Sequence, residues 1–224
     1  MDAIGKGAYG NFNTLQNSYN SAEYCIKNNI EGDFVECGVA AGSQIAAMAL
    51  ACQVNNVART IWAFDSFSGI PLADPEFDAS QPGVGYFKGN EPKVKDKKDL
   101  LVSSGITVHD VENVKNNMKQ WDIDTANFKF VKGWFQDTVA DYALQINKIA
   151  ILRLDGDLYH STVVCLEHLF PKLVSGGILI IDDWALEGCR KACNEYFKKL
   201  GGYSAVLSNM HEIEGTTPVW FIKK

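Results

Sequence analysis

Aspartates follow two apolar segments in the second half of the 224-residue chain. One segment ends in Asp155-Gly-Asp157, and the next ends in Asp182 and Asp183. Apolar runs of this length are typical of buried parallel strands, and open α/β sheets bind ligands at the carboxyl ends of their strands. Carboxylates that meet at one point repel each other unless a cation lies among them. The pattern therefore predicts a hard divalent metal at this edge of a sheet.

A glycine-containing turn, from Glu36 through Gly38 to Gly42 and Ser43, stands where an α/β fold binds a nucleotide. The dinucleotide fingerprint has a glycine at the position of Glu36. A carboxylate there would repel a pyrophosphate but attract the sulfonium and amino groups of S-adenosylmethionine, while Gly38 and Gly42 let the backbone approach the ligand. Asp65, at the end of the next strand, is placed to accept hydrogen bonds from ribose hydroxyls. The alternatives are a salt-bridged Glu36 and an Asp65 that caps a helix.

The apolar periodicity predicts the elements that would position these residues. We expect helices at 18–29, 44–54, 99–105, 108–120, 134–144, 163–173 and 187–200. We expect strands at 33–38, 60–65, 128–133, 149–154, 177–183, 203–207 and 219–222. The β-α-β order predicts parallel pairing, and the last two strands predict a hairpin that adds an antiparallel strand to the sheet.

Two segments depart from this regular pattern. Residues 1–17 are rich in glycine and asparagine and look irregular, so residues 1–31 form a candidate N-terminal lid with its helix. Residues 70–100 contain four of the six prolines, which predicts an insertion or flap. We find no linker between two domains, and expect a single domain over residues 1–224.

Composition limits the possible partners. The formal net charge of −6 and the pI of about 5.2 argue against a general nucleic-acid binder. No apolar run is long enough to cross a membrane, and no signal peptide is evident. The six cysteines lack Cys-x-x-Cys spacing, and we expect them to be reduced in a cytoplasmic protein. A homo-oligomer is possible, and the expected partner is a small molecule.

Five stretches, in their order along the chain, together resemble the macrocin O-methyltransferase family. They are residues 32–39, 64–71, 131–138, 152–159 with Ser161 and Thr162, and 176–184. The resemblance implies a Rossmann-like class I methyltransferase with a sheet of about seven strands and helices on both faces. It also implies an enzyme that methylates sugar hydroxyls of natural products with S-adenosylmethionine. The family pattern usually ends Asp-Asp-Tyr, whereas this chain has Trp184, so no role for that hydroxyl carries over.

The same resemblance assigns roles to individual residues. It implies Mg²⁺ held by Asp155, Asp182 and Asp183, with Asp157 as general base, and Asp155 also borders the cofactor. Cofactor contacts are implied at Glu36, Gly38, Asp65, Ser66, Gly133, Trp134 and Phe135. The segments 72–98 and 186–224 show no family pattern, so the identity of the acceptor does not carry over.

Asp157 also has a chemical argument as the base. In an extended Asp155-Gly-Asp157 segment both carboxylates point to one side, because strand side chains alternate. One could then bind the metal while the other takes the proton of an acceptor hydroxyl. The alternatives are structural: Asp157 would hold the turn at 159–162, and Asp182 and Asp183 would cap the next helix.

Two rival functions remain. One is a nicotinamide-dependent oxidoreductase, which Glu36 disfavours. The other is a non-catalytic methyltransferase-like binding module, which the intact acidic cluster disfavours. The four histidines are scattered: His109 and His160 could reach an acceptor, His168 is expected to be structural, and His211 has no predicted role.

Overall fold

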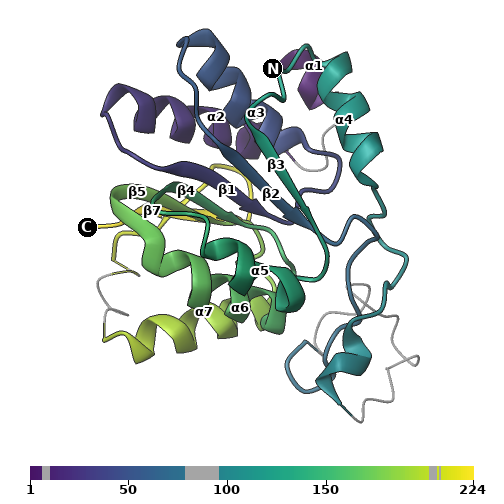
Figure 1. Ribbon diagram of the computed structural model, residues 1–224. Helices are drawn as coiled ribbons and strands as arrows, with labels where there is room; N and C mark the ends of the chain where they lie inside the picture. Colours follow the sequence, from purple (N-terminus) through teal and green to yellow (C-terminus); the bar gives the residue numbers. More distant parts are fainter. Residues whose placement is uncertain (7–10, 79–95, 202–205, 207) are drawn as a thin grey trace.

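The computed structural model describes residues 1–6, 11–78, 96–201, 206 and 208–224. They form a seven-stranded sheet in the order β3-β2-β1-β4-β5-β7-β6 (Figure 1). Its strands are β1 Asp33–Cys37, β2 Ile61–Asp65, β3 Phe128–Lys132, β4 Ile149–Leu154, β5 Leu173–Ile181, β6 His211–Glu212 and β7 Val219–Ile222. β1 to β5 pair in parallel, while β7 is antiparallel to both β5 and β6. The predicted parallel sheet with an antiparallel end is confirmed.

Helices cover both faces of the sheet (Figure 1). The helices are α1 Asp2–Gly5, α2 Phe12–Lys27, α3 Ser43–Val54, α4 Val111–Gln120, α5 Phe135–Ala143, α6 Tyr159–Leu169 and α7 Glu187–Lys199. α5, α6 and α7 lie on one face and α2 and α3 on the other. Among the described residues no helix is long and apolar enough to cross a membrane.

The alternation of strand side chains divides the core into two layers. Leu152 and Leu154 of β4 pack with α5 to α7, whereas Ile151 packs on the side of α2 and α3. By the same alternation the Arg153 side chain points toward the α2 and α3 layer, where only 2% of it is exposed. A charged residue thus lies inside an otherwise apolar strand.

Helix boundaries differ from the prediction where capping or proline chemistry decides them. α2 begins at Phe12, within the segment expected to be irregular, because the Asn11 side chain accepts a hydrogen bond from the Asn13 amide at 2.9 Å. α6 runs from Tyr159 to Leu169 rather than over 163–173, and Pro171 follows in a short 3-10 turn. β5 therefore begins four residues before the expected Gly177, at Leu173.

Residues 99–105 do not form the helix that their spacing predicted. A 3-10 turn, η1, spans Lys97–Leu100, and the chain then lies along residues 68–72. Ser104 donates its amide to the Ile70 carbonyl at 2.8 Å, and Ile70 donates to Ile106 at 3.0 Å. These backbone hydrogen bonds form in place of helical ones, and they hold the two segments together.

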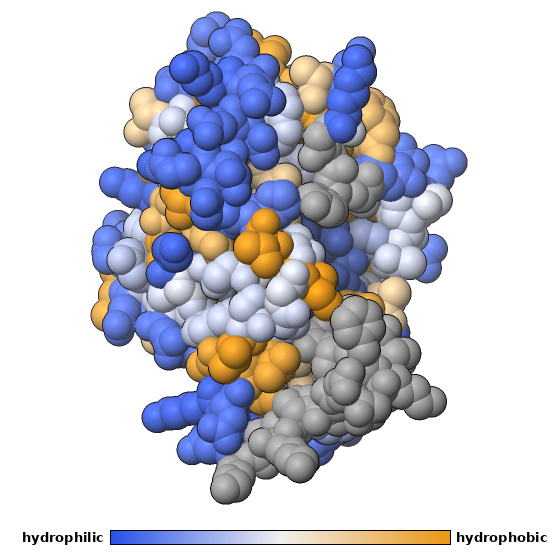
Figure 2. Space-filling view, turned by 90° about the vertical axis from the view of Figure 1, so that its right-hand side faces the viewer, coloured by the Kyte–Doolittle hydropathy of each residue, from blue (hydrophilic) through white to orange (hydrophobic). Residues whose placement is uncertain are grey.

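The strand expected at 203–207 falls mostly outside the described residues, and β6 is the strand that pairs with β7. The middle of the expected insertion, residues 79–95, also lies outside them. The side of the molecule beside α4 is mainly hydrophilic, with hydrophobic residues in separate spots (Figure 2).

Candidate active site

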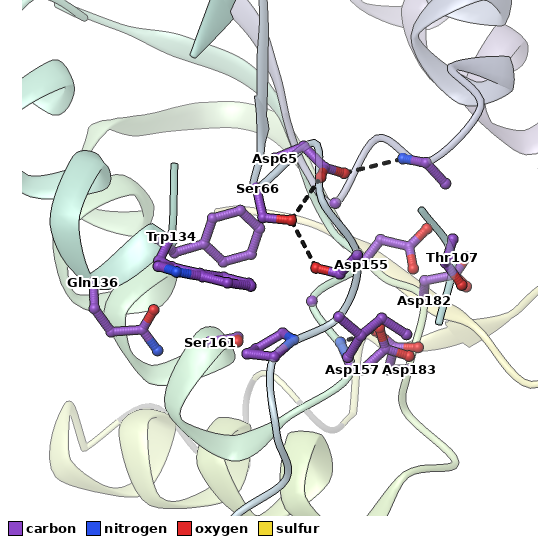
Figure 3. Close-up of a pocket in the computed structure, with 17 residues that line it drawn as sticks. Asp65, Ser66, Thr107, Trp134, Gln136, Asp155, Asp157, Ser161, Asp182 and Asp183 are labelled. Carbon is purple, nitrogen blue, oxygen red and sulfur yellow. Dashed lines mark hydrogen bonds between the residues drawn. The ribbon is translucent and has the colours of Figure 1, made fainter. Parts of the chain in front are cut away.

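A cavity of about 280 Å³ opens at the carboxyl edge of the sheet (Figure 3), where the parallel strands β1 to β5 end. It is lined by Gly38, Ala40, Asp65, Ser66, Gly69, Ile70, Pro71, Thr107, Trp134, Phe135, Gln136, Asp155, Gly156, Asp157, Ser161, Asp182 and Asp183. The aspartates that follow β4 and β5 gather on one side, and Trp134 lies across from them. The fold therefore brings the acidic cluster and part of the predicted cofactor site to one cavity.

Asp155, Asp182 and Asp183 form the group best arranged for a metal ion. Each offers one carboxylate oxygen, and these atoms lie within 4.8 Å of one another. The alternative of a helix cap fails, because α7 begins at Glu187 and its N-cap is Leu186. The carboxylates thus face the cavity instead of completing a helix.

Arg153 lies among these acids, and sequence reasoning missed it. One terminal nitrogen, Nη1, donates to Asp155 Oδ2 at 2.6 Å and to Glu36 Oε1 at 3.2 Å. The other, Nη2, donates to Asp182 Oδ1. The cation that the carboxylates were expected to need is therefore supplied in part by the protein. The available signal was an arginine in the middle of an apolar strand, since buried charges are paired.

One arginine does not neutralise the cluster. Burial raises the pKa of Asp155 to about 7, and Asp182 adds to the rise while Arg153 opposes it. Burial also raises the pKa values of Asp157 and Asp183 well above their ordinary range, and neighbouring aspartates push them further. Repelling carboxylates in a buried site favour a bound cation, which would offset both effects.

Asp157 reaches the cavity by a backbone conformation that the sequence did not predict. β4 ends at Leu154, and Asp157 has φ +59°, so the expected extended segment is wrong. A turn results, and the Asp157 amide donates to Asp183 Oδ2 at 2.8 Å. The start of α6 is held instead by Asp78, whose Oδ1 accepts the Tyr159 amide at 3.0 Å. This removes the need for Asp157 to hold that turn.

Gly38 and Asp65 shape the other side of the cavity. A Cβ on Gly38 would lie 1.7 Å from the Asp155 carbonyl oxygen, so a side chain does not fit between β1 and β4. Asp65 Oδ2 accepts the amides of Val39 and Ala40 at 2.7 and 3.1 Å, and its Oδ1 accepts the Phe67 amide at 2.7 Å. The carboxylate of Asp65 is thus fixed by backbone donors before any ligand arrives.

Four residues expected at the cofactor do not line the cavity: Glu36, Gly42, Ser43 and Gly133. Glu36 is 1% exposed and pairs with Arg153, as the salt-bridge alternative expected. A Cβ on Gly42 would lie 2.5 Å from Met118 Cε, so this glycine makes room for α4. Ser43 is the first, buried residue of α3.

The turn after β3 contributes Trp134 and Phe135, which the family resemblance implied. Trp134 borders the cavity, and Phe135 packs beneath Gly156, where a Cβ would lie 3.0 Å from its ring. Thr107 and Gln136 were not predicted individually. Thr107 has φ +54°, an uncommon conformation for a β-branched residue. Such strain is concentrated at functional sites.

The histidines lie outside this cavity. His160 Nε2 is 2.8 Å from Asp74 Oδ2, and its side chain borders a neighbouring cavity. His168 lies on α6, and His211 packs against Trp220. Among the described residues of the cavity wall, Asp157 is thus the better placed candidate for a base.

The chain is similar to known O-methyltransferases over most of its length. Residues 7–223 match the model of a family described as Macrocin-O-methyltransferase (TylF). A relative from Streptomyces olivaceus, 8-demethyl-8-(2,3-dimethoxy-alpha-L-rhamnosyl)-tetracenomycin-C 4'-O-methyltransferase, is 32% identical over 203 residues, or 88% of this chain and 70% of that protein. Demethyldecarbamoylnovobiocin O-methyltransferase from Streptomyces niveus is 34% identical over 187 residues, or 83% of this chain and 65% of that protein.

Solved structures give the same picture. The O-methyltransferase NovP superposes with a TM-score of 0.74 at 30% identity, covering 95% of this chain and 80% of that chain. The calicheamicin methyltransferase CalS11 shares the fold, with a TM-score of 0.65 at 20% identity over 93% of this chain and 76% of that chain. The predicted Rossmann-like class I methyltransferase fold is confirmed.

These matches decide against the oxidoreductase and the non-catalytic module, since the family and its named members are enzymes that transfer a methyl group to oxygen. The methyl donor implied for such enzymes is S-adenosylmethionine. From the residues matched, the chain belongs to the macrocin O-methyltransferase family.

Proposed function

We propose that this chain transfers a methyl group from S-adenosylmethionine to a hydroxyl of a small, polyhydroxylated, sugar-like acceptor, and that a divalent cation, Mg²⁺, assists. The observation that carries the proposal is the meeting of Asp155, Asp182 and Asp183 at one end of the cavity, within 4.8 Å of one another. The family supports oxygen as the acceptor atom, and a relative named for a rhamnosyl compound supports a sugar.

The residues present fit the cation. Three carboxylates supply hard oxygen ligands, which suit Mg²⁺ better than zinc, whose usual protein ligands include histidine and cysteine. Burial first, and then neighbouring aspartates, raise the pKa values of Asp155 and Asp183, and a bound cation would offset both effects. When bound, Mg²⁺ would hold acceptor oxygens and favour the deprotonated hydroxyl.

Asp157 is the residue that we assign to the proton. Methyl transfer to oxygen forms an O–C bond as the C–S bond breaks, and the hydroxyl proton must leave. Asp157 borders the cavity beside Asp183, and its amide bond to that residue fixes the backbone that carries it. In its carboxylate form it can accept that proton.

The residues at the other side of the cavity hold the donor. Gly38 lets the backbone approach, Asp65 and Ser66 offer polar atoms to the ribose, and Trp134 offers a flat face to the adenine. These groups would keep the methyl carbon in line with the acceptor oxygen, and such orientation lowers the barrier substantially.

A second cavity, of about 340 Å³, adjoins the first through Pro71, Gln136 and Ser161. Leu158 and Val163 are among the apolar residues of its wall. We assign it to the part of the acceptor that lies beyond the methylated ring. An apolar space next to a polar site fits a sugar attached to a larger apolar group.

The net charge and the cysteines bear on the partners and the cellular location of the enzyme. The net charge of −6 supports a small-molecule acceptor without nucleic acid. All six cysteines are free and buried, which supports a cytoplasmic enzyme. We assign no membrane partner.

The test is a methyl-transfer screen. The purified chain is incubated with S-adenosylmethionine, Mg²⁺ and a panel of sugars, glycosides and catechols, and S-adenosylhomocysteine and methylated product are measured. We expect methylation of a glycoside hydroxyl. Turnover confined to catechols, or a product methylated at nitrogen or carbon, would overturn the proposal.

A further inference from the structure

Arg153 carries a charge into the buried centre of β4, and its environment differs from that of an ordinary buried ion pair. The β1–β4 register places it directly opposite Glu36. Arginine and a carboxylate usually pair through two parallel hydrogen bonds. Here Glu36 receives one bond at 3.2 Å, longer than the 2.6 Å bond to Asp155.

The guanidinium is instead directed at the candidate metal ligands. Nη1 bonds Asp155 and Nη2 bonds Asp182. Arg153 Nε and Glu36 Oε2 are buried, and neither has a hydrogen-bond partner among the described residues. Arg153 thus makes only one hydrogen bond to Glu36, while each of its terminal nitrogens bonds an aspartate.

We propose that Arg153 is a positioning residue that fixes the orientation of Asp155 and Asp182 for a divalent cation. It binds Oδ2 of Asp155 and Oδ1 of Asp182, and so leaves the other oxygen of each carboxylate available to a cation. Glu36 offsets its charge from the side away from the cavity. The inference rests on the proposed function, because it assumes the metal site.

A simple counter-charge would behave differently. A fixed positive charge near a metal repels it, so its removal would strengthen metal binding. A group that orients ligands has the opposite effect: loss of such outer hydrogen bonds typically weakens metal affinity about 10–100-fold. The change in metal affinity therefore separates the two roles. Orientation predicts weaker binding once the fork is lost, whereas a counter-charge predicts unchanged binding when the charge is kept and stronger binding when it is removed.

The experiment compares the wild type with Arg153→Lys. Lysine keeps the charge but lacks the planar fork that bonds two carboxylates at once. Isothermal titration with MgCl₂, and electron paramagnetic resonance with MnCl₂, measure the affinity, while thermal unfolding and cofactor binding are recorded without metal. We expect metal affinity to fall about tenfold or more, with cofactor affinity unchanged. The matched control is Arg59→Lys, because Arg59 bonds the Gly32 carbonyl at the opposite edge.

Where Arg153→Lys does not fold, the double variant Glu36→Gln with Arg153→Met removes both charges of the buried Glu36–Arg153 pair at once and is titrated in the same way. Weaker binding supports positioning. Unchanged or stronger binding in the variants overturns it, while the wild type still binds and the proposed metal site stands. Failure of the wild type to bind either ion would overturn the metal site and this inference together.

Discussion

The carboxylates on the two sides of the cavity differ in the hydrogen-bond donors that surround them. On the cofactor side, Asp65 is held by the backbone amides of Val39, Ala40 and Phe67. On the acidic side, among the described residues, Arg153 pairs with Asp155 and Asp182, and Asp183 accepts one backbone amide, that of Asp157. The first carboxylate is stabilised by the fold itself. The acidic-side carboxylates have fewer such donors and repel one another, and a bound cation would offset this repulsion.

This difference indicates on which side the carboxylates are stabilised without a bound ligand. A charge that accepts several backbone hydrogen bonds stabilises the folded protein, whereas a buried unpaired charge destabilises it. Asp155 is paired with Arg153, yet burial and the charge of Asp182 still raise its pKa to about 7, so the fold disfavours its ionised form. We therefore expect the acidic side to depend on a cation and the cofactor side to be preorganised.

Metal removal should have the largest effect. Excess chelator should lower turnover about a thousandfold, since a metal that stabilises developing charge supplies several kcal/mol. Steady-state methyl transfer before and after chelation, with Mg²⁺ added back, measures it. Cofactor affinity should change little, because the cofactor side is complete without the metal. Full turnover in chelator would remove the distinction between the two sides.

Asp157→Asn should be next. The variant keeps the side-chain shape and the amide bond to Asp183, but it cannot accept the hydroxyl proton. We expect kcat to fall about a hundredfold or more, the usual scale for a positioned base, with Mg²⁺ affinity nearly unchanged. An equal loss of metal affinity in a titration would make Asp157 a ligand instead, and near-normal kcat would make it structural.

Two neutralising variants should move stability in opposite directions. Asp65→Asn loses charge from a carboxylate that accepts backbone amides, and should lower the free energy of unfolding by about 1–3 kcal/mol. Asp183→Asn relieves repulsion and should raise the stability of the metal-free protein. Urea denaturation in chelator measures both. A loss of stability in both variants would contradict the contrast drawn between the two sides.

A feature of the fold or the site could be predicted from the sequence when the residues that form it are neighbours along the chain. Acids at strand ends could be predicted, because an apolar run and a following aspartate lie together in the chain. The partners of Arg153 could not, since Glu36 and Asp182 come from other strands and meet it only through the register. The left-handed turn at Asp157 and the wall residue Thr107 depend on the packing of loops, which periodicity does not encode.

The pH dependence of the metal-free protein should follow the same contrast. Burial raises the pKa of Asp155 to about 7 in the folded chain, against about 3.9 in an unfolded one. Between those values the unfolded state binds fewer protons, so stability falls as pH rises through this window. Thermal unfolding from pH 4 to 8 should show that fall, and saturating Mg²⁺ should reduce it. A rise in stability over this window would contradict uncompensated charge on the acidic side.

The smallest expected effect concerns the second cavity, which adjoins the first. Val163 borders the second cavity and not the first, so Val163→Trp should fill the former while leaving the methyl-transfer residues in place. Because a blocked subsite loses apolar contact of roughly 1–2 kcal/mol, KM for a glycoside with a large apolar group should rise about tenfold. KM for a small sugar and affinity for the cofactor should stay constant. Val54→Trp, at an exposed position of α3, is the matched control. Equal increases in KM for both acceptors would place the second cavity outside the acceptor path, and would leave the two sides of the first cavity to bind the acceptor without it.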